Sequence, residues 1–428
     1  MQQEVLVLAD KSWSAWLMWG LGALCYLTAL FHRMSLSVAG LTAQERFSLD
    51  ATGLAAFSVV QLVLYAVLQV PVGAGADRFG PRRLLLAGMA AMAAGSTVFA
   101  LAASYPAAMA GRALIGAGDA CLFVNVLRLA HNWFPGRRYA LVAALTGMIG
   151  GLGQLIATAP LAALLSTFGW TTAFLAAGVV TAVLLVAVGL LLRDAPAGTS
   201  APVRGGEPLR VSLGNAWRNR GTRHAMWTHF TLMGGFVSFT AVLGQPYLVS
   251  TQGRTVAAAS GLLGVMVLGF VVASTAAGQL ASRRPGLRAP LVAGSAVAGT
   301  LCWVVLVVVP GPLPQAVLAT VLIVIGAAGG VSMLAFDLAR SANHGHQAGI
   351  ASGVANMGGF MFAVVAELAV GVLLDALLAH GVAAPQAHRL AFGVVLAMSV
   401  AGTARLATLH RHAGVLPQRP EPVLAHAG

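Results

Sequence analysis

The chain is 428 residues long, and 58% of its residues are hydrophobic while 9% are charged. A typical soluble domain carries about 25% charged residues, so this composition excludes water as the main solvent of the chain. The formal net charge of +13 does not indicate a nucleic-acid partner, because the basic residues are distributed among the breaks between apolar runs. The three cysteines, Cys25, Cys121 and Cys302, lie inside apolar runs, which favours packing over disulfide bonds or a metal site.

Apolar runs long enough to cross a bilayer follow one another along the chain. A hydrocarbon core of roughly 30 Å requires about 20 apolar residues in a helix. The N-terminal segment lacks the features of a cleaved signal peptide, so the first helix is expected to stay in the protein. The sequence predicts an all-α membrane protein with twelve transmembrane helices, near residues 14–40, 51–75, 82–103, 106–132, 139–165, 169–192, 223–250, 255–281, 287–309, 313–340, 346–376 and 386–409.

The distribution of lysine and arginine predicts the orientation, because positively charged loops are retained in the cytoplasm. On one side, the connections between the predicted helices hold Arg46, Arg254 and Arg389. The other side holds many more basic residues, in the tails, at 78–83, 137–138 and 283–288, and in the polar segment from Arg193 to Arg223. We therefore expect a multi-pass protein of the inner membrane, surrounded by the lipid bilayer, with both termini in the cytoplasm.

The two halves of the chain resemble each other, which indicates an internal duplication. Residues 73–83, GAGADRFGPRR, have a weaker counterpart in residues 278–288, GQLASRRPGLR, and residues 118–128 align with 330–340. The expected organisation is two pseudo-symmetric six-helix bundles. They comprise an N-terminal bundle at 1–192, a cytoplasmic linker at 193–222, a C-terminal bundle at 223–410 and a cytoplasmic tail at 411–428.

Several of these segments resemble motifs of the major facilitator superfamily. Residues 73–83 look like its motif A, G-x-x-x-D-R-x-G-R-R, with a proline at position 81. Residues 112–118, RALIGAG, resemble motif B of the fourth helix, and Trp133-Phe134-Pro135 resembles the usual exit from that helix. The segment 168–174 resembles the start of the sixth helix, although Thr171 replaces the usual arginine. The resemblance to the superfamily extends across essentially the whole chain.

The resemblance implies a secondary transporter and not an enzyme. Such a protein moves a small-molecule substrate by alternating access of its two halves, needs no cofactor and usually works as a monomer. Protons are the default coupling ion. The tyrosine and arginine of the first helix, Tyr26 and Arg33, resemble organic-anion and sugar-phosphate permease-like members, which favours a small organic anion as the substrate.

Other functions remain open on the sequence alone. Efflux of a drug or metabolite by proton antiport is the main alternative, although the fifth helix lacks motif C, G-x-x-x-G-P-x-x-G. Pairs of soft ligands, His229 with Met233 and Met357 with Met361, raise transport of a copper-like metal as a minor alternative. A sensor that binds a solute without moving it is a further one. We expect no resident metal.

We expect motif A to act as a conformational latch. Asp77 carries a negative charge that a helix N-terminus or an arginine can hold on the cytoplasmic side. The alternative is that Asp77 and its arginines form a solvated turn whose positive charges only reflect its cytoplasmic position. The residues expected to form the latch are Gly73, Asp77, Arg78, Gly80, Arg82 and Arg83.

Polar residues within the apolar helices are candidates for the substrate cavity, because ionisable groups at membrane depth are costly. For Arg33, substrate contact competes with pairing to Asp119 or a role at the helix end. Gln61, Tyr65 and Gln69 form a polar stripe on the second helix. This stripe either lines the transport pathway or makes hydrogen bonds to neighbouring helices. The candidate cavity residues are Tyr26, Arg33, Gln61, Tyr65, Gln154, His229, Gln245 and Asn356.

Proton coupling requires an acid at membrane depth that can take up a proton, and the resemblance implies that the motif B arginine, Arg112, assists it. Arg112 and Asp119 lie seven residues apart and share a helix face, so they either take part in coupling or form a structural pair. The second half contributes two buried acids. The candidate coupling residues are Arg112, Asp119, Asp337 and Glu367.

Overall fold

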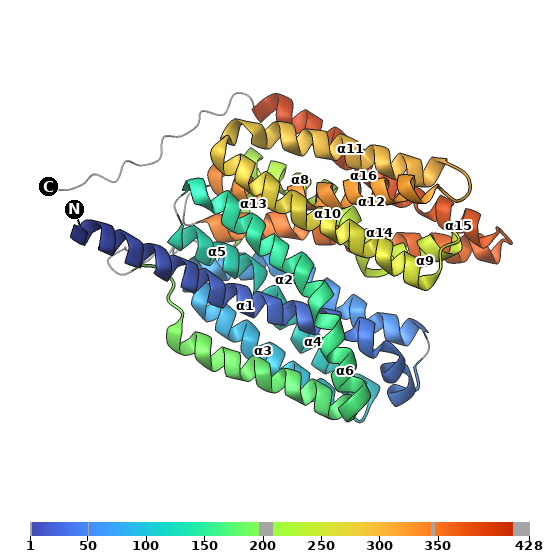
Figure 1. Cartoon of the computed structure of the whole chain (residues 1–428), viewed down its shortest axis with the longest axis horizontal. Helices are drawn as coiled ribbons and strands as arrows, with labels where there is room; N and C mark the ends of the chain where they lie inside the picture. The colour runs from blue at the N-terminus through green and yellow to red at the C-terminus, as the bar shows by residue number, and fades with distance from the viewer. Residues whose placement is uncertain (1, 50, 135, 197–208, 344–346, 414–428) are drawn as a thin grey trace.

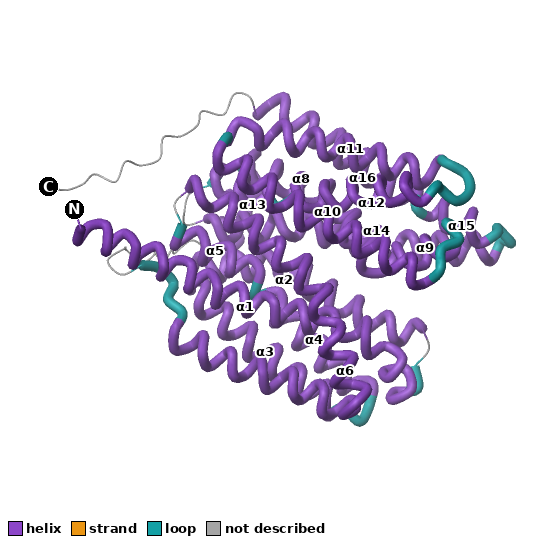
Figure 2. Tube along the Cα trace, viewed as in Figure 1, coloured by secondary structure: helices purple, strands orange, loops and turns teal. Residues whose placement is uncertain are grey.

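The computed structural model describes residues 2–49, 51–134, 136–196, 209–343 and 347–413. These residues form helices joined by short turns, and no strand occurs among them (Figure 2). Eleven helical segments within the described residues are long and apolar enough to cross a membrane, and Arg138–Gly150 is a shorter apolar one. The predicted fold class, an all-α membrane protein, is therefore confirmed.

The N-terminal half forms one bundle of long helices, drawn in blue to green in Figure 1. Its elements are α1 (Gln2–Phe47), α2 (Ala51–Phe79), α3 (Pro81–Leu101), α4 (Tyr105–Ala120), α5 (Phe123–Trp133) and α6 (Gly136–Leu191).

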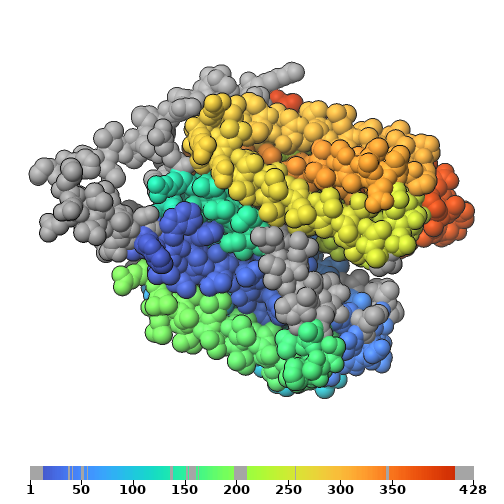
Figure 3. All heavy atoms as spheres, in the orientation of Figure 1, coloured from blue at the N-terminus to red at the C-terminus, as the bar shows by residue number. Residues whose placement is uncertain are grey.

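The C-terminal half forms the second bundle, which lies above the first in the views of Figures 1 and 3. It is preceded by a short helix, α7 (Leu209–Arg218). Its elements are α8 (Arg220–Ser238), the π-helix η1 (Phe239–Leu243), α9 (Gly244–Ser250), α10 (Val256–Arg283), the 3₁₀-helix η2 (Pro285–Leu287), α11 (Arg288–Val308), α12 (Gln315–Val331), α13 (Leu334–Ala342), α14 (Ala348–Ala379), α15 (Ala384–Ala391) and α16 (Gly393–Ala413).

Several predicted helix boundaries differ from the structure. The predicted seventh helix is divided into α8, η1 and α9, and the predicted twelfth into α15 and α16. The helices predicted at 139–165 and 169–192 are joined in α6, and the chain reverses at Gly169, whose φ of 74° is open to glycine without steric cost. The predicted fourth helix is divided into α4 and α5 at Cys121, and the tenth into α12 and α13 at Ser332. At both divisions the backbone makes hydrogen bonds to the third residue before, as in a tight turn.

The helix α7 lies within the segment predicted as a linker. Its apolar side, with Leu213 and Ala216, packs against Val70 of α2 and Ile350 of α14. Its opposite side is exposed, including Val211. This helix was not predicted, because a segment of ten residues is too short to form a stable helix without the packing of the rest of the protein.

The two halves meet mainly near one end of the bundle. We name it the linker end, and it carries the α2–α3 turn at 79–81, residues 192–196 after α6, the end of α13 and the start of α14 (Figure 1). Hydrogen bonds and ring contacts between the halves join residues 65–77, 123 and 139–148 to residues 274–275, 336–340 and 349–360. All of these lie on the linker-end portions of their helices, so the halves are closed together there.

Candidate functional site

An ion pair lies between helices of the N-terminal half. Arg33 of α1 donates from Nε to Oδ2 of Asp119 at 2.9 Å and from its terminal nitrogen to Oδ1 at 2.8 Å. Asp119, near the end of α4, is fully buried, and the Arg33 side chain is 16% exposed. This two-point geometry is the strong form of an arginine–carboxylate contact. Of the alternatives for Arg33, the structure thus contains the pairing with Asp119.

A second arginine is held beside this pair without touching the acid directly. The buried Arg112 donates to the side chain of Gln61, to Oγ of Ser35 at 3.1 Å and to the carbonyl oxygen of His32 at 3.2 Å. Gln61 in turn donates to Asp119 at 3.4 Å. Arg112 therefore reaches Asp119 through the Gln61 amide, and the two do not form an ion pair.

The C-terminal half reaches this cluster through α14. The guanidinium of Arg33 lies 4.4 Å from the ring centre of Tyr65 and 5.5 Å from that of Phe360. Asn356 donates from Nδ2 to the hydroxyl oxygen of Tyr65 at 3.1 Å. The buried His229 of α8 lies beside Asn356. Four predicted cavity residues from both halves, Arg33, Tyr65, His229 and Asn356, are thus brought together.

A layer of four rings lies on the linker-end side of the ion pair. Tyr26 packs on Phe123 with ring centres 5.1 Å apart, Phe123 on Phe336 at 5.0 Å, and Phe336 on His229 at 4.9 Å. Phe123 and Phe336 lie just after the divisions of the fourth and tenth helices. Neither phenylalanine was predicted as a site residue, because an apolar ring within an apolar helix carries no signal that separates it from ordinary packing.

Other predicted site residues lie elsewhere. Gln245 is exposed on α9, away from the cluster, and the side chain of Gln154 lies outside the described residues. Asp337 pairs with Arg288 at 2.6 Å, at the linker end of α11 and α13. Glu367 of α14 is half-buried, and its Oε1 has no hydrogen-bond partner among the described residues.

The residues expected to form a latch divide into two contacts. Asp77 accepts hydrogen bonds from the backbone N–H groups of Gly349 and Ile350, each at 2.9 Å, at the N-terminus of α14. Arg128 of α5 approaches the same carboxylate to 3.4 Å. A carboxylate at a helix N-terminus is stabilised by the unpaired N–H groups and the helix dipole. Asp77 therefore ties α2 to the other half.

The rest of motif A contacts the end of α6. Arg82 donates its backbone N–H to Oδ1 of Asp194 at 2.7 Å, and Gly80 has a φ of 85° beside the same carboxylate. Burial raises the pKa of Asp194 above its ordinary value, and the hydrogen bond from Arg82 opposes that rise. Arg78 and Arg83 are exposed.

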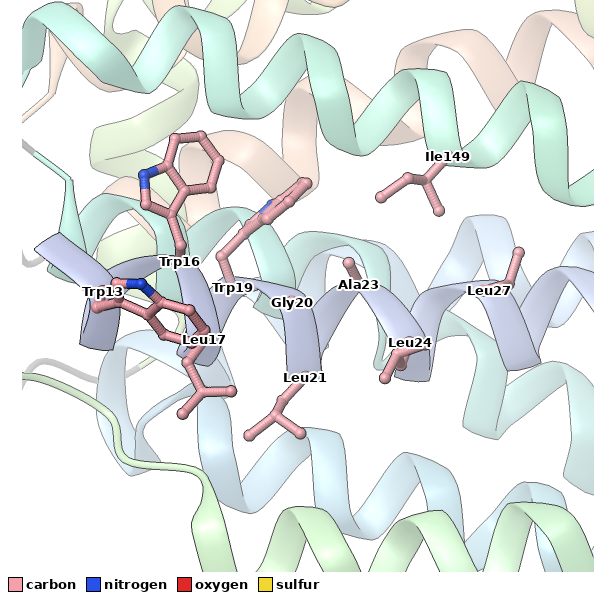
Figure 4. A pocket seen from close by; sticks show the side chains of 10 residues that line it. All are labelled: Trp13, Trp16, Leu17, Trp19, Gly20, Leu21, Ala23, Leu24, Leu27 and Ile149. Carbon is pink, nitrogen blue, oxygen red and sulfur yellow. The ribbon is translucent and has the colours of Figure 1, made fainter.

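A groove of about 810 Å³ runs along α1. Its lining is almost wholly apolar and includes Trp13, Trp16, Trp19 and Ile149 (Figure 4). Trp13 is 75% exposed, so the groove opens to the outside of the bundle. It contains none of the charged residues of the cluster, and we assign it to the lipid-facing surface. Among the described residues, no three histidine, cysteine or acidic side chains gather as a metal site would require.

The comparison with protein families gives one match, to the model described as Major Facilitator Superfamily, over residues 22–367. This range includes the ion pair, motif A and most of both halves. The chain belongs to the major facilitator superfamily. Members of this superfamily are transporters and not enzymes, and the family suggested by the sequence motifs is confirmed.

Curated relatives within the superfamily match over part of their length. The oxalate:formate antiporter of Oxalobacter formigenes is 32% identical over 138 residues, which cover 32% of each chain. A probable L-galactonate transporter of Escherichia coli is 27% identical over 162 residues, or 38% of this chain and 36% of that protein. The chain thus spans about a third of the length of these relatives.

The solved structures extend the likeness to the whole fold. The major facilitator transporter FucP in its outward conformation superimposes with a TM-score of 0.68 at 17% identity, covering 91% of this chain and 99% of that one. At 17% identity this likeness shows a shared fold and nothing further.

Proposed function

We propose that this major facilitator protein carries a small organic anion across the inner membrane together with protons, by alternating access of its two halves. The site of binding is the cluster around Arg33, Asp119, Tyr65 and Asn356. The transporting unit is the single chain, since both halves and the whole cluster belong to it. Its relatives include an oxalate:formate antiporter and a probable L-galactonate transporter, and the substrates of both are carboxylates.

The observation that carries this proposal is the ion pair between Arg33 and Asp119. An arginine with a two-point carboxylate partner is a site that a substrate carboxylate can occupy in its place. The exchange needs Asp119 to lose its charge, because two carboxylates at one guanidinium repel each other. A proton on Asp119 thus frees Arg33 for the anion, and the two are carried together.

The proposed orientation places the linker end in the cytoplasm. The bias of basic residues toward this end supports it. In this orientation the contacts between the halves at the linker end close the cytoplasmic side. Transport then proceeds as the halves rock around the cluster, and the substrate shifts the two states only through a difference in its affinity for them.

The proposal is tested in proteoliposomes with a pH-sensitive dye inside and oxalate or L-galactonate outside. We expect anion-dependent acidification by the unaltered protein. Asp119→Asn should abolish the proton movement but retain exchange of labelled anion, because the amide keeps the shape of the site and cannot take up a proton.

Asp337→Asn is the matched control, since Asp337 pairs with Arg288 at the linker end and lies outside the cluster. It should leave anion-driven proton movement in place. Retained coupling in Asp119→Asn would remove Asp119 as the proton carrier. Absence of movement of both anions in the unaltered protein would contradict the proposed substrate class.

A further inference from the structure

One stripe of residues on α2 faces one stripe on α14. The α2 residues are spaced four apart and so share one face of the helix. We call the two stripes together the α2–α14 seam, which comprises Tyr65, Gln69, Gly73 and Asp77 of α2 and Phe360, Asn356, Gly353 and Gly349 of α14. The seam runs from the ion pair to the linker end.

The end of the seam that lies farther from the linker end is in contact with the Arg33–Asp119 pair. The Tyr65 ring is 2% exposed and lies 4.4 Å from the Arg33 guanidinium and 4.4 Å from the centre of the Phe360 ring. Its hydroxyl oxygen accepts a hydrogen bond from Asn356 at 3.1 Å. Asn356 uses its other N–H to bond Gln69 Oε1 at 2.7 Å. Both N–H groups of this amide, on the C-terminal half, are thus bound to the N-terminal half.

The part of the seam nearer the linker end is packed backbone to backbone. A Cβ atom placed on Gly73 would lie 2.5 Å from the carbonyl oxygen of Gly349, and one on Gly353 would lie 2.4 Å from that of Gln69. Asp77 then binds the N-terminus of α14. Because so close a contact leaves no room for sliding, a displacement at Tyr65 is transmitted along the seam instead of being absorbed within it.

We infer that Tyr65 and Asn356 are positioning residues that couple the charge state of the Arg33–Asp119 pair to the closure of the linker end. The inference rests on the proposed function. When a proton reaches Asp119 or an anion takes its place on Arg33, the guanidinium changes its position against the Tyr65 ring. The ring supports Arg33, while the hydroxyl reaches the amide of the other half. The hydroxyl is therefore the atom that passes the change to α14.

Tyr65→Phe tests this role, because it removes the hydroxyl and keeps the ring against Arg33 and Phe360. Tyr105→Phe is the matched control, since the Tyr105 hydroxyl donates to the carbonyl oxygen of Gly53 at 3.2 Å within the N-terminal half. The reporter is a cysteine at Val70, buried beneath α7 and α14. It is placed in a chain whose native Cys25, Cys121 and Cys302 are replaced by serine.

Without any solute, Tyr65→Phe should raise the rate of thiol labelling at position 70 by about two- to tenfold, as expected for one hydrogen bond lost from the closed state. Tyr105→Phe should leave the rate unchanged. Oxalate or L-galactonate, at a concentration that saturates binding to each protein, should alter the labelling rate of the unaltered protein but not that of Tyr65→Phe. Asn356→Leu combined with Tyr65→Phe should add little to Asn356→Leu alone, because Asn356→Leu already removes the bond to Tyr65 together with the bond to Gln69.

Labelling of Tyr65→Phe at the unaltered rate, with a normal response to anion, would overturn the inference. Equal effects of Tyr105→Phe would also overturn it, since the hydroxyl between the halves would then have no special role. A lack of any anion response in the unaltered protein would count against the proposed function instead. In that case the comparison without solute still decides whether Tyr65 holds the seam closed.

Discussion

At the scale of single residues, the Arg33–Asp119 pair both offsets the cost of burying two charges and holds Arg33 in position. A charge at membrane depth costs at least about 2.5 kcal/mol on insertion scales, so neither residue is stable there without the other. The same pairing keeps Arg33 in a fixed position while no substrate is bound. Arg112 is satisfied separately through Gln61 and Ser35, which leaves Asp119 as the acid for Arg33.

Replacing Asp119 with alanine should lower the stability by about 3–5 kcal/mol, because it leaves Arg33 charged and unpaired. Replacing both residues, Arg33→Met with Asp119→Ala, should recover much of that loss. The measurement is thermal unfolding in detergent, followed by tryptophan fluorescence. If the double variant is no more stable than the single one, the pair does not account for the loss.

At the scale of secondary structure elements, close approach of α2 and α14 depends on Gly73 and Gly349. Small residues at helix contacts in membranes allow backbones to meet, since lipid competes for apolar side chains. Gly75 is two residues away on α2, but a Cβ there would meet the end of the Leu84 side chain, at 3.2 Å. A flexible side chain gives way more easily than a backbone carbonyl group.

Gly73→Ala should therefore push α2 and α14 apart and shift the protein toward the state with an open linker end. Gly75→Ala, the same change on the same helix, should shift it little. The distance between spin labels on α2 and α14, measured by pulsed electron paramagnetic resonance, separates these outcomes. Equal distance distributions in the two variants would exclude a role for the Gly73 contact in closure.

At the scale of the whole molecule, the two halves are not closed together symmetrically. Asp77 of the N-terminal half binds the N-terminus of α14, whereas Ser282 occupies the corresponding place in the second half. On that side Arg340 lies 4.9 Å from the ring centre of Tyr139, and Asp337 holds Arg288. A cation over a ring, worth about 0.5–2 kcal/mol, thus joins the halves where the second copy of motif A has lost its acid.

Asp77→Asn should raise the population open at the linker end by about tenfold, because the hydrogen bonds to a charged carboxylate are weakened by at least about 1.4 kcal/mol. Asp375→Asn is a suitable control, since Asp375 is an exposed acid near the opposite end of α14. Accessibility of an engineered cysteine at Val70 reports the change. An unchanged population in Asp77→Asn would show that this carboxylate does not hold the closed state.

Part of the candidate site was predictable from the sequence. Arg33, Tyr65, Asp119 and Asn356 stood out because polar groups are rare in these helices, and all four belong to the cluster. Gln245 stood out for the same reason, yet it is exposed on α9. Phe123 and Phe336 did not stand out at all. Polarity marks a residue as costly in lipid but does not say which way its side chain points.

The sequence by itself determined the helical membrane fold, the duplication and the family, because the bilayer imposes length and apolarity on each segment locally. The tertiary structure decided which residues are partners. Arg33 and Asp119 are 86 positions apart, and Asp77 and Gly349 are 272 apart. Such contacts depend on how helices pack against one another and on where they are divided, as at Cys121 and Ser332. A local pattern of polar and apolar residues does not contain information on the packing or on the divisions.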